Sequence, residues 1–98
     1  WNKPEAACLA SRIPYGEEIT IDKLKMIEKA EAYLNSLIHG QVRVRWHRGV
    51  ARIETAVDAF SIILEHRQEI TEIVKKLGFS YVTLDLIGYR KGSLNEVL

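Results

Sequence analysis

Two stretches of the chain carry apolar residues at steps of three and four, which is the spacing of one face of an α-helix. The first predicts a helix from about Ile21 to Leu37, because Thr20 suits the N-cap and Asp22 puts a negative charge in the first turn. The buried stripe of this helix is expected to hold Leu24, Ile27, Ala30, Glu31, Leu34 and Ile38. The second stretch predicts one continuous helix over Val57 to Leu77.

Between these helices, residues 41–55 alternate between polar and apolar positions, which is the period of a half-buried strand. The pair Arg48-Gly49 interrupts the alternation, so this segment is predicted to be a β-hairpin. Both apolar sets must face the same core, and this condition fixes the register. The expected pairs are Trp46 opposite Ala51, Val44 opposite Ile53 and Val42 opposite Thr55.

Alternation returns from Phe79 to Leu86 and predicts a third strand. The second helix then becomes a crossover, so the third strand should run parallel to the second, and it can pair beside either strand of the hairpin. The predicted fold class is α+β, with two helices packed on a three-stranded mixed sheet in the order helix, strand, strand, helix, strand. Residues 1–18 are expected to be a loop carrying the single cysteine, residues 19–87 the α+β domain, and residues 88–98 a tail that packs on a partner domain or lines the site.

Composition limits the classes of function. A net charge of +1 gives no general argument for binding nucleic acid or an anionic membrane, and no apolar run approaches the ~20 residues of a membrane span. A single cysteine cannot form an internal disulfide or a cysteine-rich zinc site, and His39, His47 and His66 lack metal-ligand spacing. We therefore expect a cytoplasmic protein with no metal, no nucleic acid and no membrane among its partners.

Cys8 is the first candidate for chemistry, because it lies within four residues of Arg12 in a segment closed by Pro14 and Gly16. The thiolate is the reactive form of cysteine, and a nearby cation stabilises it. The alternative is an inert, buried cysteine, since alanine and leucine residues surround it and free cysteine is often buried. The residues taken alone favour the inert interpretation.

The outer face of the predicted hairpin is the second candidate site. There, Arg43 lies opposite Glu54, which predicts an ordinary solvated ion pair. Arg45 lies opposite Arg52, and such a like-charge pair costs stability unless an anion or another carboxylate lies between the two. Arginine forks suit phosphate and carboxylate groups. A bound anion and a solvated arginine surface are equally open interpretations.

Five blocks of the chain stand in the order and spacing of a known family: KPEAACLASRIPYGEEIT, QVRVRWH, ARIE, YVTLDL and GYRKGSLNE. In these blocks the chain resembles the C-terminal region of LarE, the ATP-dependent sacrificial sulfur transferases of the ATP pyrophosphatase (PP-loop) superfamily. The resemblance implies that an N-terminal ATP-binding domain is absent from this chain, which begins at Trp1 and carries no glycine-rich phosphate loop. ATP and magnesium are expected in that domain, so this chain alone should bind no cofactor and be inactive.

The resemblance also implies a reaction, in nickel-pincer cofactor biosynthesis. In this family the ATP-binding domain adenylylates a carboxylate of a pyridinium mononucleotide, and a cysteine attacks the activated carboxylate and gives up its sulfur. Cys8 matches that sacrificial cysteine, and Arg43 and Arg45 match anion-binding arginines near the substrate phosphate. Glu54 and Glu31 match carboxylates of the same site, where one would assist elimination as a base.

Ser11 and Arg12 lie beside the cysteine and are expected to position the substrate. Some relatives use several cysteines to hold an iron–sulfur cluster, and the single Cys8 favours the sacrificial version. The partners implied are the missing ATP-binding domain, a small anionic mononucleotide and a second copy of the chain in a homo-oligomer. The alternative function is a noncatalytic interaction or oligomerisation module, with an inert Cys8 and an arginine face that pairs with acids of a neighbouring domain.

Overall fold

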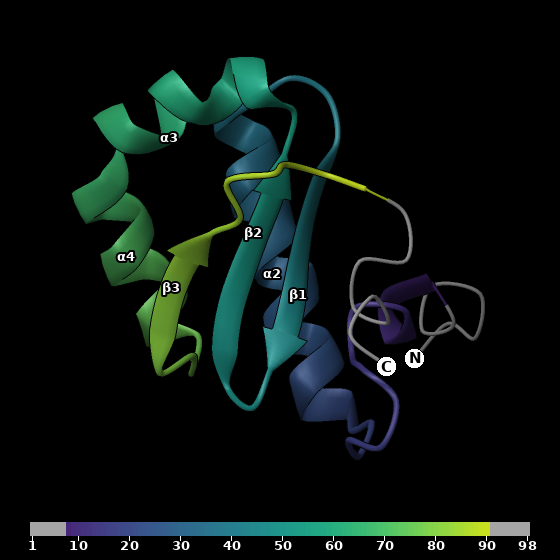
Figure 1. Ribbon diagram of the computed structural model, residues 1–98. Helices are drawn as coiled ribbons and strands as arrows, with labels where there is room; N and C mark the ends of the chain where they lie inside the picture. Colours follow the sequence, from purple (N-terminus) through teal and green to yellow (C-terminus); the bar gives the residue numbers. More distant parts are fainter. Residues whose placement is uncertain (1–7, 91–98) are drawn as a thin grey trace.

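A three-stranded mixed sheet forms the centre of the fold (Figure 1), which a computed structural model describes over residues 8–90. Strands β1 (Val42–His47) and β2 (Val50–Thr55) form an antiparallel hairpin. Strand β3 (Tyr81–Leu84) runs parallel to β2 on its other side, so the strand order is β1-β2-β3. The α+β class, the mixed sheet and the order of the elements are confirmed.

The register of the hairpin is the predicted one at every pair, including Arg45 opposite Arg52 and Arg43 opposite Glu54 on the outer face. Both turn residues have positive φ, with 48° at Arg48 and 87° at Gly49. A two-residue turn of this kind matches the right-handed twist of the strands. The turn therefore supports the register that the apolar positions require.

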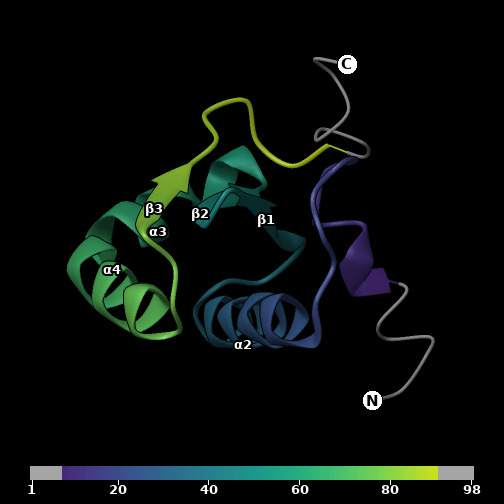
Figure 2. The same ribbon diagram turned by 90° about the horizontal axis from the view of Figure 1, so that it is seen from below.

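Helix α2 (Ile21–Leu37) begins and ends at the predicted residues. The Thr20 hydroxyl accepts a hydrogen bond from the Lys23 N–H at 3.1 Å, which caps the helix. The helix covers one face of the sheet, with α4 (Arg67–Lys76) beside it (Figure 2). Between these helices and the sheet lies the core, whose most buried members include Ile27, Leu34, Val42, Val44, Ile53 and Val74.

The continuous helix predicted over residues 57–77 is wrong. The structure has a 3₁₀ turn η1 (Val57–Ala59), a short helix α3 (Phe60–Glu65) and then α4, with the backbone leaving the helical region at His66. The His66 ring nitrogen Nδ1 lies 3.0 Å from the Ile62 carbonyl oxygen, a local hydrogen bond that stabilises this break. On the two sides of the break, Ile63 and Ile70 are buried, whereas Leu64 is exposed.

The ends of the sheet differ from the prediction as well. Strand β3 is shorter than the expected residues 79–86, because Phe79 turns into the core against the Trp46 ring, 5.6 Å between centroids. Residues 85–90 then cross the face of the sheet opposite α2 (Figures 1 and 2), and we call this segment the strap. Of the predicted tail, residues 91–98 lie outside the described residues. No helix within residues 8–90 has the length and apolar character needed to cross a membrane.

Candidate functional site

The Cys8 segment is docked along the free edge of β1. Residues 8–10 are helical rather than loop, and residues 1–7 of the predicted loop lie outside the described part of the chain. Leu9 and Ile13 point into the core, while the Arg12 carbonyl accepts a hydrogen bond from the Trp46 N–H of β1 at 2.8 Å. Because these neighbours take the buried positions, Cys8 itself is exposed. The interpretation that the residues alone favour is a buried and inert cysteine. The structure shows that this interpretation is wrong about burial.

A buried ion pair holds this segment in place. Arg12 donates Nε to Glu31 Oε2 at 2.8 Å and Nη2 to Glu31 Oε1 at 3.1 Å, a bidentate contact between two side chains that are each about nine-tenths buried. Glu31 Oε2 also accepts the Val44 N–H of β1 at 2.9 Å. Arg12 and Glu31 thus join the Cys8 segment, α2 and the sheet edge, and the charge of Arg12 is balanced.

The carbonyl oxygen of Cys8 accepts a cluster of donors. Arg12 Nη1 lies at 2.8 Å, the Ser11 hydroxyl at 2.7 Å and the Ser11 N–H at 3.3 Å. Arg12 Nη1 also donates to the Ser11 hydroxyl oxygen at 2.9 Å, which orients that hydroxyl toward Cys8. The Cys8 carbonyl is therefore polarised by a cation and a hydroxyl at once.

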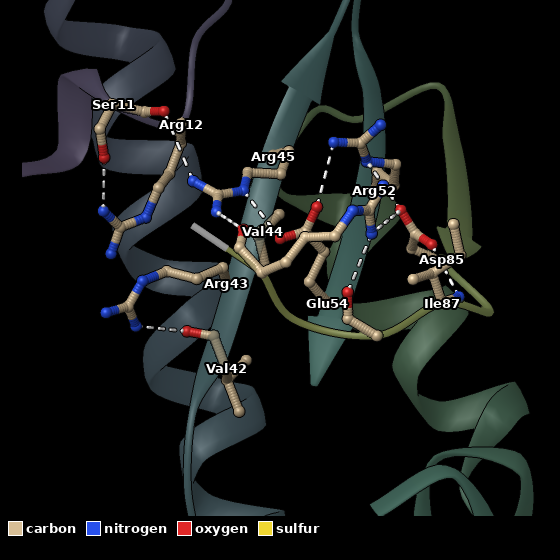
Figure 3. Close-up of polar contacts among 12 residues, drawn as sticks. Ser11, Arg12, Val42, Arg43, Val44, Arg45, Arg52, Glu54, Asp85 and Ile87 are labelled. Atoms are coloured by element: carbon tan, nitrogen blue, oxygen red, sulfur yellow. Dashed lines mark hydrogen bonds and ion pairs between the residues drawn. The ribbon is translucent and has the colours of Figure 1, made fainter. Parts of the chain in front are cut away.

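Glu54 lies between the two arginines that the hairpin register places opposite each other (Figure 3). Its side chain is fully buried and accepts Arg45 Nε on Oε1 and Arg52 Nη2 on Oε2, both at 3.0 Å. The carboxylate required by the like-charge pair is thus the neighbouring Glu54. The solvated pair expected between Arg43 and Glu54 is wrong, because Glu54 is fully buried and pairs with Arg45 and Arg52 instead.

The strap continues this network of charges. Asp85 Oδ2 lies 3.6 Å from Arg52 Nε and 3.2 Å from Arg90 Nη1. Burial alone raises the pKa of Asp85, but the hydrogen bond from the Ile87 N–H and the positive charges of Arg90 and Arg52 outweigh it and hold the pKa below 3.8. Asp85 is therefore ionised near neutral pH and ties the strap to the sheet.

Arg43 and Arg45 point to the same side of β1 as the strap. Arg45 donates Nη2 to the Arg90 carbonyl at 3.2 Å and lies 3.5 Å from the Ser11 carbonyl through Nη1. Arg43 is half-buried, donates Nη1 to the Val42 carbonyl at 2.9 Å and, within residues 8–90, makes no ion pair. Arg43 thus retains donors that can bind an anion.

The residues predicted from the sequence fall into two groups. Ser11 joins the Cys8 turn to Arg45, so the thiol-bearing segment and the arginines meet at one edge of the sheet (Figure 3). Glu31 and Glu54 lie beneath them, each engaged with arginine. Across the described ranges no group of three histidine, cysteine or acidic residues is arranged to hold a metal ion.

Sequence reasoning named none of the strap residues Asp85, Tyr89 and Arg90 as site residues, although it gave lining of the site as one of two options for residues 88–98. Tyr89 lies under both arginines, with its ring centroid 5.3 Å from Arg43 Cζ and 6.0 Å from Arg45 Cζ. The predicted strand alternation ends at Leu86, so no periodic signal indicated where residues 87–90 would pack. The turn residues Gly88 and Asp85 were the available signal for a return across the sheet.

His47, at the end of β1, gives the site edge a predicted dependence on pH. Burial lowers the pKa of His47 first, and the Arg52 charge lowers it further, against smaller opposing effects of Glu17 and Glu54. The folded state therefore binds fewer protons than the unfolded state, so stability is complete above about pH 6.5 and falls as the pH drops below it. Urea unfolding at about pH 7.5 and 5.5 measures this loss.

His47→Gln should remove part of that pH dependence, whereas the exposed His39→Gln should keep it. An unchanged slope of stability with pH in His47→Gln would show that another group is responsible.

These features define a class of site: an exposed thiol beside arginines, at the edge of a small α+β domain. No family model matches the chain. Over its whole length the chain is 41% identical to the pyridinium-3,5-bisthiocarboxylic acid mononucleotide synthase of Lactiplantibacillus plantarum, covering 36% of that protein. It is 46% identical to the uncharacterized protein slr1717 of Synechocystis sp., covering 37%, and 37% identical over 89% of the chain to MJ0830 of Methanocaldococcus jannaschii, covering 34%.

The chain spans about a third of the length of the curated relatives it matches. The similarity to the synthase runs over the whole of this chain.

Proposed function

We propose that this chain forms the sulfur-donor and substrate-binding part of an ATP-dependent sulfur transferase, acting on an adenylylated pyridinium carboxylate mononucleotide in nickel-pincer cofactor biosynthesis. The observation that carries the proposal is the exposed Cys8 on a clamped turn that also contacts Arg45. The name of the L. plantarum relative describes synthesis of a pyridinium mononucleotide with two thiocarboxylic acid groups, and the similarity to it supports the same class of product here.

The chemistry has two stages. The Cys8 sulfur attacks the carbonyl carbon of the acyl adenylate, AMP leaves, and a thioester joins the substrate to the protein. A base then removes the Cα proton of Cys8, and the Cβ–S bond breaks with its electrons on sulfur. The product is a thiocarboxylate, and the residue left at position 8 is dehydroalanine. The activated carboxylate comes from an ATP-binding domain outside this chain. Arg43, whose donors are mostly unengaged, would bind the substrate phosphate, and the buried Arg45 would add positive charge beside it.

The donors on the Cys8 carbonyl suit the second stage. Removing the Cα proton places negative charge on the adjacent carbonyl oxygen, where Arg12 Nη1 and the Ser11 hydroxyl already lie within 2.8 Å. Donors fixed in advance at a developing negative charge lower the barrier without reorganisation. Glu31 keeps Arg12 in this position through its bidentate contact. Glu31 and Glu54 accordingly act as supports of the arginines, and the proton passes to a solvent base.

Ser11→Ala should slow elimination more than attack. Removing one such donor costs up to ~10²-fold in rate, so the thioester on Cys8 should accumulate during a time course. Intact-mass measurement of the quenched full-length protein distinguishes the thioester from dehydroalanine. Ser11→Thr, which keeps a hydroxyl, is the matched control. Equal rates of dehydroalanine formation in Ser11→Ala and the unmodified protein would show that the Ser11 hydroxyl does not assist elimination.

The proposal itself is tested by protection of the thiol. In the full-length protein, saturating nicotinic acid mononucleotide should slow alkylation of Cys8 by iodoacetamide several-fold, whereas the phosphate-free nucleoside should protect less at equal concentration. Arg43→Ala should remove the difference between the two ligands. Alkylation at the same rate with and without mononucleotide would contradict a substrate site beside Cys8. The noncatalytic alternative is disfavoured, because Cys8 is exposed and Arg12, Arg45 and Arg52 are paired with acids of this chain.

A further inference from the structure

The strap brings an aromatic ring to the arginine face of the sheet. Residues 85–90, which include Tyr89, cross the sheet on the side opposite α2 (Figure 2). Arg43 and Arg45 stand two positions apart on β1 and therefore share that side. Both guanidinium groups lie over the same Tyr89 ring, at 5.3 and 6.0 Å from its centroid.

The position of Tyr89 is fixed by backbone contacts with β2. Its N–H donates to the Thr55 carbonyl at 2.9 Å, and the Asp85 N–H donates to the Ile53 carbonyl at 2.9 Å. Gly88 permits this close approach, since its φ is +99° and a Cβ there would lie 3.0 Å from the Thr55 oxygen. The ring is therefore held against the sheet by a segment that requires glycine at the preceding residue.

The Tyr89 ring offsets electrostatic repulsion between the two arginines on this face of the sheet. Two neighbouring arginines repel each other, and Glu54 balances only the one at position 45. Arg43 makes no ion pair within residues 8–90, so the negative face of the Tyr89 ring is its compensating contact there. A guanidinium held over a ring loses little freedom when it then binds a phosphate.

We infer that Tyr89 is a positioning residue of the phosphate site, whose ring holds the guanidinium group of Arg43 beside the buried Arg45 so that Arg43 binds the phosphate of the mononucleotide. The inference rests on the proposed function. It assigns the strap a part in selecting a mononucleotide over the corresponding nucleoside. Tyr89 acts through the arginines rather than by stacking on the pyridinium ring, because its ring contacts are with the arginine side chains.

The test measures affinity in the full-length protein by titration with nicotinic acid mononucleotide and with nicotinic acid riboside. Tyr89→Leu should weaken mononucleotide binding ~3- to 10-fold, the range expected for a cation–π contact, and leave riboside binding unchanged. Tyr89→Phe keeps the ring and should stay within about twofold of the unmodified protein. Tyr81→Leu, at an exposed tyrosine of β3, is the matched control and should change neither affinity.

Fluorinated phenylalanines at position 89 separate positioning from folding, because fluorine weakens the negative face of the ring at nearly constant size. Mononucleotide affinity should fall stepwise with each added fluorine, and riboside affinity should not. One outcome would overturn the inference and leave the proposed function in place. In that outcome, mononucleotide affinity is the same across the fluorine series and in Tyr89→Leu, but it is weakened in Arg43→Ala. Equal affinities of the unmodified protein for mononucleotide and riboside would overturn both.

Discussion

Replacing Cys8 with alanine is expected to abolish sulfur transfer by the full-length protein while leaving its free energy of unfolding within about 0.5 kcal/mol. The thiol supplies the sulfur in the proposed reaction, and no other cysteine is present in this chain. The side chain is exposed, so its removal creates no cavity. The measurement is formation of the thiocarboxylate product from the adenylylated substrate, paired with urea unfolding.

Ser36→Ala, at an exposed serine of α2, serves as the control and should retain full turnover. Undiminished product from Cys8→Ala would assign the sulfur to another source and leave the chain with the noncatalytic role.

Glu54→Ala is expected to destabilise the fold by about 3–5 kcal/mol, the cost of removing one partner from a buried ion pair. The side chain of Glu54 is fully buried and holds both Arg45 and Arg52 at 3.0 Å. Its loss leaves the guanidinium of Arg45 buried without this carboxylate, and it leaves a cavity at a fully buried position. Urea unfolding followed by circular dichroism measures the change.

Glu72→Ala removes an exposed acid from α4 and should shift stability by less than about 0.5 kcal/mol. A loss of under about 1 kcal/mol in Glu54→Ala would mean that solvent reaches this pair.

The hairpin register and α2 were predictable because the chain offers one arrangement that buries its apolar residues. Moving one strand of the hairpin by one residue would place Val44 and Ile53 on opposite faces of the sheet and expose one of them, so the alternation defines a single pairing. The Thr20 cap and the stripe through Leu34 likewise agree on one helix. In these elements the local pattern and the tertiary contacts favour the same structure.

The break at His66 was not predictable from periodicity. No glycine or proline marks it, and the apolar spacing continues through it. The break depends on a hydrogen bond between the His66 ring and the Ile62 carbonyl and on the way α4 packs beside α2, which a local pattern does not contain.

The sequence allowed several residues of the candidate site to be identified, but it did not allow their contacts and burial to be predicted. The register identified Arg45 opposite Arg52 as a pair that needs a carboxylate, but it did not indicate that Glu54 would be buried between them. Nor did it indicate that Asp85, 31 residues further along the chain, would pair with Arg52. The exposure of Cys8 likewise follows from the burial of Leu9 and Ile13 in the core. No strand or helix period in this segment predicted that burial.

The most direct test of the proposed donor is the intact mass of the full-length protein before and after incubation with ATP, magnesium and the pyridinium carboxylate mononucleotide. The proposal predicts the loss of one hydrogen sulfide, mapped by peptide analysis to residue 8 as dehydroalanine, and no such loss in Cys8→Ala. An unchanged mass at residue 8 despite confirmed formation of the thiocarboxylate product would contradict it and would assign the sulfur to an external or cluster-bound donor.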